Sequence, residues 1–418
     1  MRFDMPATGA LNGLRILDLG IAMAGPQATR LLADFGAEVI KIDSLARPDM
    51  ARTGFGPHVG DPAIENSGYF NNFNRNKLRA AINMAKPEGR EVFSRLVEVS
   101  DAVLENFSAG VMTRWGFDYA NLKRLKPDIV YCSMAGLGQV GPYREYQTFG
   151  PTVQAVAGMV HVTGRPELPP SGWGYSYMDH TGGYYGAMAI LAALLHRRRT
   201  GEGQHIDLSQ TEAAITMTGI SLLDYAVNGR ASTRIGNASG DPMMAPHGIY
   251  RCAAENEAVG DDEWVAIACE TGAQWDSFCE ATGHPEWRLD PRFLSVTSRI
   301  ANSEALDALV EGWTRGRTKD DVMTTLQAVG VAAGSVQRSM DLFENDPQLA
   351  HRGLYPEVEH ALLGRHRIDG MPVRMSRTQP EYSTGAPLLG QDNARVFGEI
   401  LGMPAGEIAR LESEQVLW

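Results

Sequence analysis

Long hydrophobic runs are missing from this sequence of 418 residues. The longest run, residues 187–195, is too short to span a bilayer, which takes about 20 apolar residues. The first ten residues, MRFDMPATGA, also lack the apolar segment of a signal peptide. We therefore expect a cytoplasmic protein with no membrane partner.

Cysteine is scarce, and its spacing excludes the common metal sites. Cys132, Cys252, Cys269 and Cys279 stand singly, with no CxxC pair and no histidine cluster at metal spacing. Four scattered cysteines are typical of reduced core residues. We expect no structural metal.

Positive charge is also in short supply. The chain has 38 Lys and Arg against 50 Asp and Glu, a formal net charge of -12. Such a balance argues against nucleic acid or an anionic membrane as the main partner, although a local basic pocket for phosphates stays possible.

The N-terminal pattern indicates a parallel sheet. A short apolar strand over residues 14–19 is followed by a glycine turn, a helix that ends at Gly36, and a second strand over residues 38–42. This order defines a βαβ unit. An acid after the second strand, Asp43, would suit a dinucleotide fold, but Gly20 and Gly25 do not form the GxGxxG fingerprint. NAD is therefore not expected.

A chain of this length suggests two domains. We expect an α/β fold with a Rossmann-like large domain and a smaller α+β domain. Residues 1–225 form the first part of the large domain and residues 226–335 the small one, because a Gly, Pro and Met-rich loop and a new strand pattern begin near Arg234. Residues 336–418 follow as a third segment.

Asp179 is the best candidate for a catalytic residue. It precedes a helix with small residues in its first turns, a basic end at residues 197–199 and a stop at Gly201. An Asp in this position is more often a helix N-cap. However, it follows an aromatic and glycine-rich segment that could line a pocket, and a helix that is apolar almost all round would be buried and hold it rigidly.

A basic segment precedes the third expected strand. Arg75, Lys77 and Arg79 could form a solvated edge strand guarded by charge, or they could bind the phosphates of an anionic cofactor. The sequence leaves both interpretations open.

Seven ordered blocks carry a resemblance to a known family. The sequence resembles the family III CoA-transferases, the relatives of formyl-CoA, carnitine and bile-acid CoA-transferases, from about residue 11 to residue 401. The blocks are LNGLRILDLG, AGPQATRLLADFGAEVIKID, NFNRNK, LENFSAGV, PDIVYCSMAGLGQVGPY, MDHTGG and LHRRRTGEGQHIDLS.

The resemblance implies a binding site for coenzyme A as a substrate thioester, with no permanently bound cofactor. The residues that it assigns to CoA are Ala24, Ile82, Asn83, Asn106, Phe107, Arg114 and Gly136. Ala135 stands where relatives often have a cofactor-contacting residue, which puts that contact in doubt. The loop of residues 236–240 resembles one that closes over the reacting centre, so Gly240 is a further candidate.

The resemblance also implies the assembly. The tail of residues 336–418 should return to the large domain, and two subunits should interlock. A homodimer or a heteromer with a related subunit would both fit.

The expected reaction needs one carboxylate. Asp179 would attack an acyl-CoA, and the liberated thiolate would then form an aspartyl-CoA thioester that a carboxylic acid resolves. An Asp is ionised at neutral pH, so no general base is required. Backbone N–H groups at Gly182 and Gly183 are candidate oxyanion donors.

The residues around Asp179 suggest the acid that accepts CoA. Met23 stands where the formyl-CoA enzyme has a polar residue, and Trp173, Tyr175 and Tyr177 precede the nucleophile. An aromatic pocket favours a bulky or aryl-bearing acid. The aromatic block resembles that of transferases that use succinyl-CoA to activate acids such as benzylsuccinate.

Two alternatives remain. An α-methylacyl-CoA racemase shares the fold, but such enzymes have a His-Asp pair where this chain has Phe149 and Gly150. The chain could also be one subunit of a heteromeric transferase.

Overall fold

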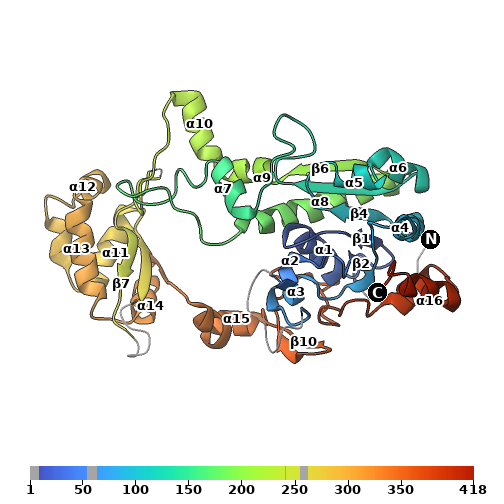
Figure 1. The fold of residues 1–418 in the computed structure, drawn as a ribbon. Helices are drawn as coiled ribbons and strands as arrows, with labels where there is room; N and C mark the ends of the chain where they lie inside the picture. The colour runs from blue at the N-terminus through green and yellow to red at the C-terminus, as the bar shows by residue number, and fades with distance from the viewer. Residues whose placement is uncertain (1–8, 54–63, 241, 255–261) are drawn as a thin grey trace. The chain divides into compact units, whose positions relative to one another are not determined.

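The computed structural model describes residues 9–53, 64–240, 242–254 and 262–418. Within these residues the chain divides into two compact units (Figure 1). Unit 1 comprises Met1–Val160, Gly172–Ala231 and Leu349–Trp418, and unit 2 comprises His161–Ser171 and Ser232–Gln348. That the chain forms separate domains with the predicted boundaries stays a prediction.

A six-stranded sheet with the order β3-β2-β1-β4-β5-β6 forms the centre of unit 1. All five neighbouring pairs are parallel, and the order reverses between β1 and β4, as in doubly wound dinucleotide-binding folds. The Rossmann-like α/β fold is therefore confirmed. The strands are β1 (Arg15–Asp18), β2 (Glu38–Asp43), β3 (Leu78–Ala81), β4 (Ala102–Glu105), β5 (Val130–Ala135) and β6 (His205–Ser209).

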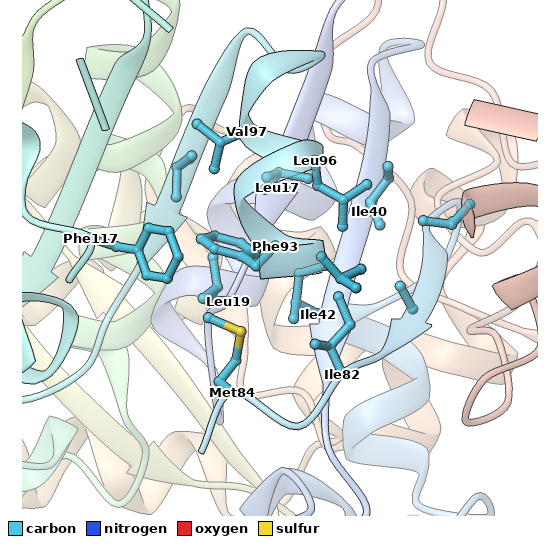
Figure 2. Packing of buried hydrophobic residues seen from close by; sticks show 14 of the residues in the cluster. Leu17, Leu19, Ile40, Ile42, Ile82, Met84, Phe93, Leu96, Val97 and Phe117 are labelled. Carbon is cyan, nitrogen blue, oxygen red and sulfur yellow. The ribbon is translucent and has the colours of Figure 1, made fainter. Parts of the chain in front are cut away.

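Successive residues of the central strands face opposite sides of the sheet, so each strand supplies two hydrophobic layers. On one side Leu17 and Ile40 pack against Phe93 and Leu96 of α4 (Pro87–Glu98), as Figure 2 shows. On the other side Ile16 and its neighbours pack against helices α1 (Ala24–Asp34) and α8 (Tyr177–Thr200).

Helix α8 comes close to its neighbours because it carries glycines. A side chain at Gly186 would collide with the Met134 sulfur, and one at Gly183 would collide with Gln27 of α1. The helix ends at Gly201, whose φ of 79° is the left-handed cap expected there.

The remaining helices of unit 1 connect or cover these layers. They are α2 (Met50–Thr53), α3 (Gly68–Phe73), α5 (Val111–Trp115), α6 (Tyr119–Leu125), α7 (Gly150–Val156), α9 (Gln210–Met217), α10 (Gly219–Asn228), η3 (Ala394–Ile400) and α16 (Ala405–Ser413). Helix α15 (Pro347–Arg352) begins at the boundary between the units, and β10 (Glu357–His360) and β11 (Gly364–Arg367) form a hairpin.

The C-terminus closes one edge of the large sheet. Leu417 forms an antiparallel bridge with Ile82, and the Asn83 N–H donates to the Val416 carbonyl at 2.8 Å. The side chains of Asp392 and Asn393 accept from the backbone N–H groups of Arg79 and Ala81. The edge of β3 is thus occupied by residues from the end of the chain.

Unit 2 has a three-stranded antiparallel sheet and its own core, which includes Trp275, Phe278 and Trp313. Its elements are β7 (His247–Arg251), β8 (Trp264–Ala268), α11 (Gly272–Thr282), η1 (Pro285–Leu289), α12 (Val296–Ala301), α13 (Ser303–Thr314), α14 (Lys319–Gln327), β9 (Ala332–Ser335) and η2 (Asp341–Asn345). This is the expected smaller α+β part.

None of the described helices combines the length and apolar character needed to cross a bilayer.

Candidate active site

Asp179 lies in the first turn of α8, which begins at Tyr177 after the cap residue Ser176. It is therefore the third helical residue and not the N-cap. Its backbone N–H donates to the Ser176 carbonyl at 3.1 Å, and the Ser176 hydroxyl donates to its carboxylate. The partial positive charge of the helix start favours an anion here. Burial nevertheless raises the pKa of Asp179 to about 6, although the hydrogen bond from the Ser176 hydroxyl lowers it.

Helix α7 forms a wall beside the carboxylate. A Cβ at Gly150 would lie 2.7 Å from Oδ2 of Asp179 and equally near Cβ of Ser176, so a side chain there would displace both. Gln154, one turn later, donates from Nε2 to the Tyr175 carbonyl at 2.7 Å. Helix α7 thus holds the segment that leads into α8.

Asp179 lines a cavity of about 920 Å³ in unit 1, a size typical of ligand sites. The wall combines the β1–α1 turn, the residues that follow β4 and β5, the start of α7 and residues 172–176. The predicted site residues that share this wall with Asp179 are Met23, Asn106, Phe107, Gly136, Trp173 and Tyr175. Their roles in binding stay predictions.

Side chains hold the β1–α1 turn that carries Met23. Asn106 accepts from the Ile21 N–H at 2.7 Å and donates to the Ile21 carbonyl at 3.0 Å. Ala22 has a φ of 57°, unusual for a residue with a side chain, and its N–H donates to Asp49 at 2.9 Å. Asn106 therefore positions the turn as well as lining the cavity.

Gly136 is the point where the loop after β5 approaches itself. A Cβ at this position would overlap with the Thr148 side chain, so only glycine fits. The Gly136 carbonyl accepts from the Thr211 hydroxyl at 2.8 Å and from its N–H at 2.9 Å. Glycine is therefore required here for packing, at a position that lines the cavity.

The expected oxyanion donors need correction. Gly182 and Gly183 lie inside α8, where the N–H of each residue is bonded to the carbonyl four residues earlier. Both are buried and pack against Gln210 and Gln27, and neither lines the cavity. Their small size serves helix packing.

Other predicted residues also lie off the cavity wall. Ile82 is fully buried and Asn83 is bonded to the C-terminal residues, so the proposed adenine bed is covered in this chain. Ala24 is buried at the start of α1, and Tyr177 packs edge-on against Trp173 without lining the cavity. Gly240 belongs to unit 2, and its role stays a prediction.

The basic segment before β3 is neither solvated nor free for phosphates. The Arg75 guanidinium pairs with Asp34 at 2.7 Å, and Lys77 pairs with Asp18 at 2.9 Å. Arg79 pairs with Asp43 at 2.6 Å. All six side chains are buried, so both interpretations from the sequence were wrong.

Arg114 lines a second cavity of about 460 Å³. The two cavities share Ser108, Ala109 and Arg144 as lining residues and therefore meet there. The second cavity also contains Glu105, whose pKa is raised to about 7 by burial although it accepts from the Phe107 N–H at 2.7 Å.

Several lining residues were not identified from the sequence. Tyr69 of α3 lines the first cavity, and burial, together with the nearby Asp179 carboxylate, raises its pKa well above the usual value. Ser176 could have been recognised, because a serine three residues before an acid is a known helix-start pattern. Gln154 and Arg144 carried no such signal.

Among the described residues, no group of three or more His, Cys, Asp or Glu is placed to hold a metal ion. The site therefore consists of a partly buried carboxylate at a helix start, in a largely apolar cavity at the carboxyl edge of a parallel sheet. This arrangement is that of an α/β enzyme with a carboxylate in its pocket.

The comparisons with known proteins agree on one family. The model of CoA-transferase family III matches residues 11–393. A probable CoA-transferase of Mycobacterium tuberculosis is 37% identical over 97% of this chain, which spans 50% of that relative. The succinyl-CoA–D-citramalate CoA-transferase of Chloroflexus aurantiacus is 32% identical, with 97% of this chain and 98% of the relative covered.

A solved structure supports the same assignment. A CaiB/BaiF family protein from Brucella suis matches with a TM-score of 0.85 and 31% identity, covering 94% of this chain and 100% of that one. The chain belongs to CoA-transferase family III, and it is a CoA-transferase.

Proposed function

We propose that this chain moves CoA from succinyl-CoA to a carboxylic acid through covalent intermediates on Asp179. The observation that carries the proposal is the Asp179 carboxylate, which lines the larger cavity and has no cationic partner among the groups that shift its pKa. A carboxylate without a salt bridge keeps its electron pair available for attack.

The reaction can be written with one carboxylate. An Asp179 oxygen attacks the thioester carbonyl, the C–S bond breaks and CoA leaves as thiolate, which gives a mixed anhydride. The thiolate attacks the Asp179 carbonyl of the anhydride and releases succinate, leaving an aspartyl-CoA thioester. The acceptor carboxylate then repeats these steps in reverse order, so that its own thioester leaves and Asp179 is restored. No net proton transfer is required.

The raised pKa of Asp179 fits this role. With a pKa of about 6, most of the residue is ionised at neutral pH, and the attacking form needs no base. A carboxylate of higher basicity is also the better nucleophile in general.

A racemase is the less favoured alternative. It would need a second group to exchange the α-proton, and no histidine lines the larger cavity within the described residues. Gly150, which lies against Asp179, has no side chain to serve as a base.

The donor and acceptor rest on two different observations. Succinyl-CoA is supported by the names of relatives that act with D-citramalate and mesaconate. For the acceptor, Met23, Phe107 and Trp173 give the cavity an apolar and aromatic wall, which favours a bulky or aryl-bearing acid such as benzylsuccinate. A dicarboxylic acid such as mesaconate, named for a relative, is the second candidate acceptor.

The experiment is intact-mass spectrometry of the protein with succinyl-CoA, trapped with hydroxylamine or borohydride and followed by peptide mapping. We expect a label on Asp179 that is absent from Asp179→Asn and present in the control Glu412→Gln, which changes an exposed carboxylate of α16 that lines neither cavity. Absence of any label in the wild type, together with α-proton exchange in deuterated water, would favour the racemase. Turnover with benzylsuccinate, mesaconate and oxalate then ranks the acceptors, and oxalate alone would exclude the aryl-acid assignment.

We further propose that a second copy of the chain covers α10. This helix has no buried residue, and Ile220, Leu223 and Val227 are 81%, 66% and 77% exposed. Such an apolar helix is typical of a subunit interface. Light scattering on the purified chain should give a dimer. A chain that stays monomeric until a related subunit is added would support the heteromer instead, as one relative is named an alpha subunit.

A further inference from the structure

Of the described residues that line the larger cavity, only Arg144 is a lysine or arginine. Ala135, at the end of β5, contributes a methyl group and no charge. Under the function proposed above, the ligand is a CoA thioester with a diphosphate and a further phosphate. The positions of the arginine side chains therefore determine how the ligand is oriented in the cavity.

Arg144 stands where the two cavities meet. It lines both, whereas Arg114 lines the smaller cavity alone. A thioester whose reactive carbonyl reaches Asp179 and whose nucleotide end extends toward Arg114 must pass the shared residues. Arg144 is the guanidinium on that path.

The guanidinium of Arg144 is available to a ligand. Its ion pair is with its sequence neighbour Glu145 at 3.4 Å, and the two side chains are 55% and 76% exposed. Exposed pairs of this kind contribute little to stability. The diphosphate of CoA carries two negative charges and offers paired oxygens for a bidentate contact with arginine. It would therefore displace Glu145 from the Arg144 guanidinium.

The loop that carries Arg144 is fixed at both ends. Gly136 lies against Thr148, and the Gln139 N–H donates to Asp207 at 2.9 Å. The Phe149 N–H donates to the Thr152 hydroxyl at 2.8 Å, at the start of α7. Arg144 therefore sits in the middle of a segment whose ends are held by β6 and by the helix beside Asp179.

We infer that Arg144 is a phosphate-binding residue that selects CoA thioesters, by holding the diphosphate where the two cavities meet. The inference rests on the proposed function and adds the residue that lets the enzyme tell CoA from a shorter thiol. Glu145, Asp118 and Glu105 are the acids on the wall of the smaller cavity among the described residues.

The test compares two thioesters that differ in their phosphates. Succinyl-CoA has them, and the succinyl thioester of N-acetylcysteamine does not. For Arg144→Gln we expect kcat/KM with succinyl-CoA to fall about 10- to 100-fold, the range of a lost bidentate contact to a charged group, through KM more than kcat. The phosphate-free thioester should react at an unchanged rate.

Two further variants make the test specific. Arg144→Lys should recover part of the loss, because it keeps the charge but not the planar fork. Arg124→Gln is the control: this exposed arginine of α6 lines neither cavity, so both thioesters should react at unchanged rates.

The outcomes separate the inference from the function on which it rests. An equal loss for both thioesters would assign Arg144 to loop geometry, and no loss with either would remove it from the site; each result overturns the inference. In both cases the Asp179 label would still form and the proposed function would stand. Absence of the label from the wild type would instead overturn the function itself.

Discussion

Two kinds of aspartate lie along the carboxyl edge of the same sheet. Asp18 and Asp43 are the last residues of β1 and β2, and each pairs with a cationic side chain. Asp179 lies on α8, and no cationic side chain is among the groups that shift its pKa. Burial alone would raise the pKa of Asp18, but the charges of Lys77 and Lys41 outweigh it, and the pKa is lowered. For Asp179 burial prevails and the pKa is raised.

The partner decides what a buried carboxylate does. Paired with a cation, it stays ionised and stabilises the turn between β1 and α1, as Asp18 does when it accepts from the Gly20 N–H at 2.7 Å. Without a cation it costs stability and keeps its reactivity, which is the usual condition of a functional carboxylate. The comparison predicts opposite responses to mutation and to pH.

Removing the lone carboxylate should give the largest effect. Asp179→Asn is expected to lower turnover by about a thousandfold or more, because the nucleophile is gone. The same change should raise the free energy of unfolding at pH 7 by about 1 to 2 kcal/mol, since a carboxylate with a raised pKa is destabilising when ionised. Denaturant titration and steady-state rates measure both. A variant that is inactive but less stable would contradict the expectation.

Removing the partner of a paired carboxylate should act on stability. Lys77→Met leaves Asp18 buried without its charge partner, which costs about 3 to 5 kcal/mol of unfolding free energy. Urea titration measures the loss, and Lys123→Met, an exposed lysine of α6, is the control with little change expected. A loss below about 1 kcal/mol would show that Lys41 alone suffices for Asp18.

The two kinds of carboxylate should respond to pH with opposite signs. The folded-state pKa of Asp179 lies above its ordinary value of 3.8, so its destabilising effect appears as pH rises from about 4 to 6 and is complete above 6. The pKa of Asp18 is lowered, so its stabilising contribution is present at neutral pH and is lost on acidification below its ordinary pKa.

The stability difference between Asp179→Asn and the wild type should therefore vanish near pH 4. The rate of Asp179 labelling should rise about tenfold per pH unit up to pH 6 and then level off, because only the ionised form attacks. A labelling rate that is flat between pH 5 and 7 would contradict the raised pKa.

An uncharged side chain offers the smallest test of the same rule. Gln27 is fully buried, and neither of its amide atoms has a hydrogen-bond partner within the described residues. Gln27→Leu should raise the free energy of unfolding by about 1 kcal/mol. Gln274→Leu is the control and should lower the free energy of unfolding, because the Gln274 amide is hydrogen-bonded to Glu270, Thr271 and Gly330. A less stable Gln27→Leu would show that the amide has a partner in solution.

The sequence predicted those features that depend on local pattern. The strand–turn–helix order gave the parallel sheet, and the acid, small residues and glycine stop placed Asp179 at the start of α8. The family resemblance assigned Asn106 and Gly136 to CoA, and that role stays a prediction. Their contacts with Ile21 and Thr148 within the protein could not be predicted from the sequence.

The features that were missed depend on residues far apart in the chain. Arg75 and Asp34 are separated by 41 positions and Lys77 and Asp18 by 59, so nothing local indicates that the basic segment is neutralised. The packing of Gly183 against Gln27 requires knowing that α1 and α8 are neighbours. Such pairings follow from topology and not from composition.

The bridge between Ile82 and Leu417 has a consequence for how the protein is made. The strand that receives the bridge is synthesised early, whereas Leu417 is synthesised much later. On the ribosome, the outer edge of β3 therefore stays uncovered by this segment until Leu417 has left the exit tunnel. Unpaired strand edges invite aggregation. The emergence of the segment around Leu417, and not the translation of the large sheet, is thus the moment at which this edge becomes protected.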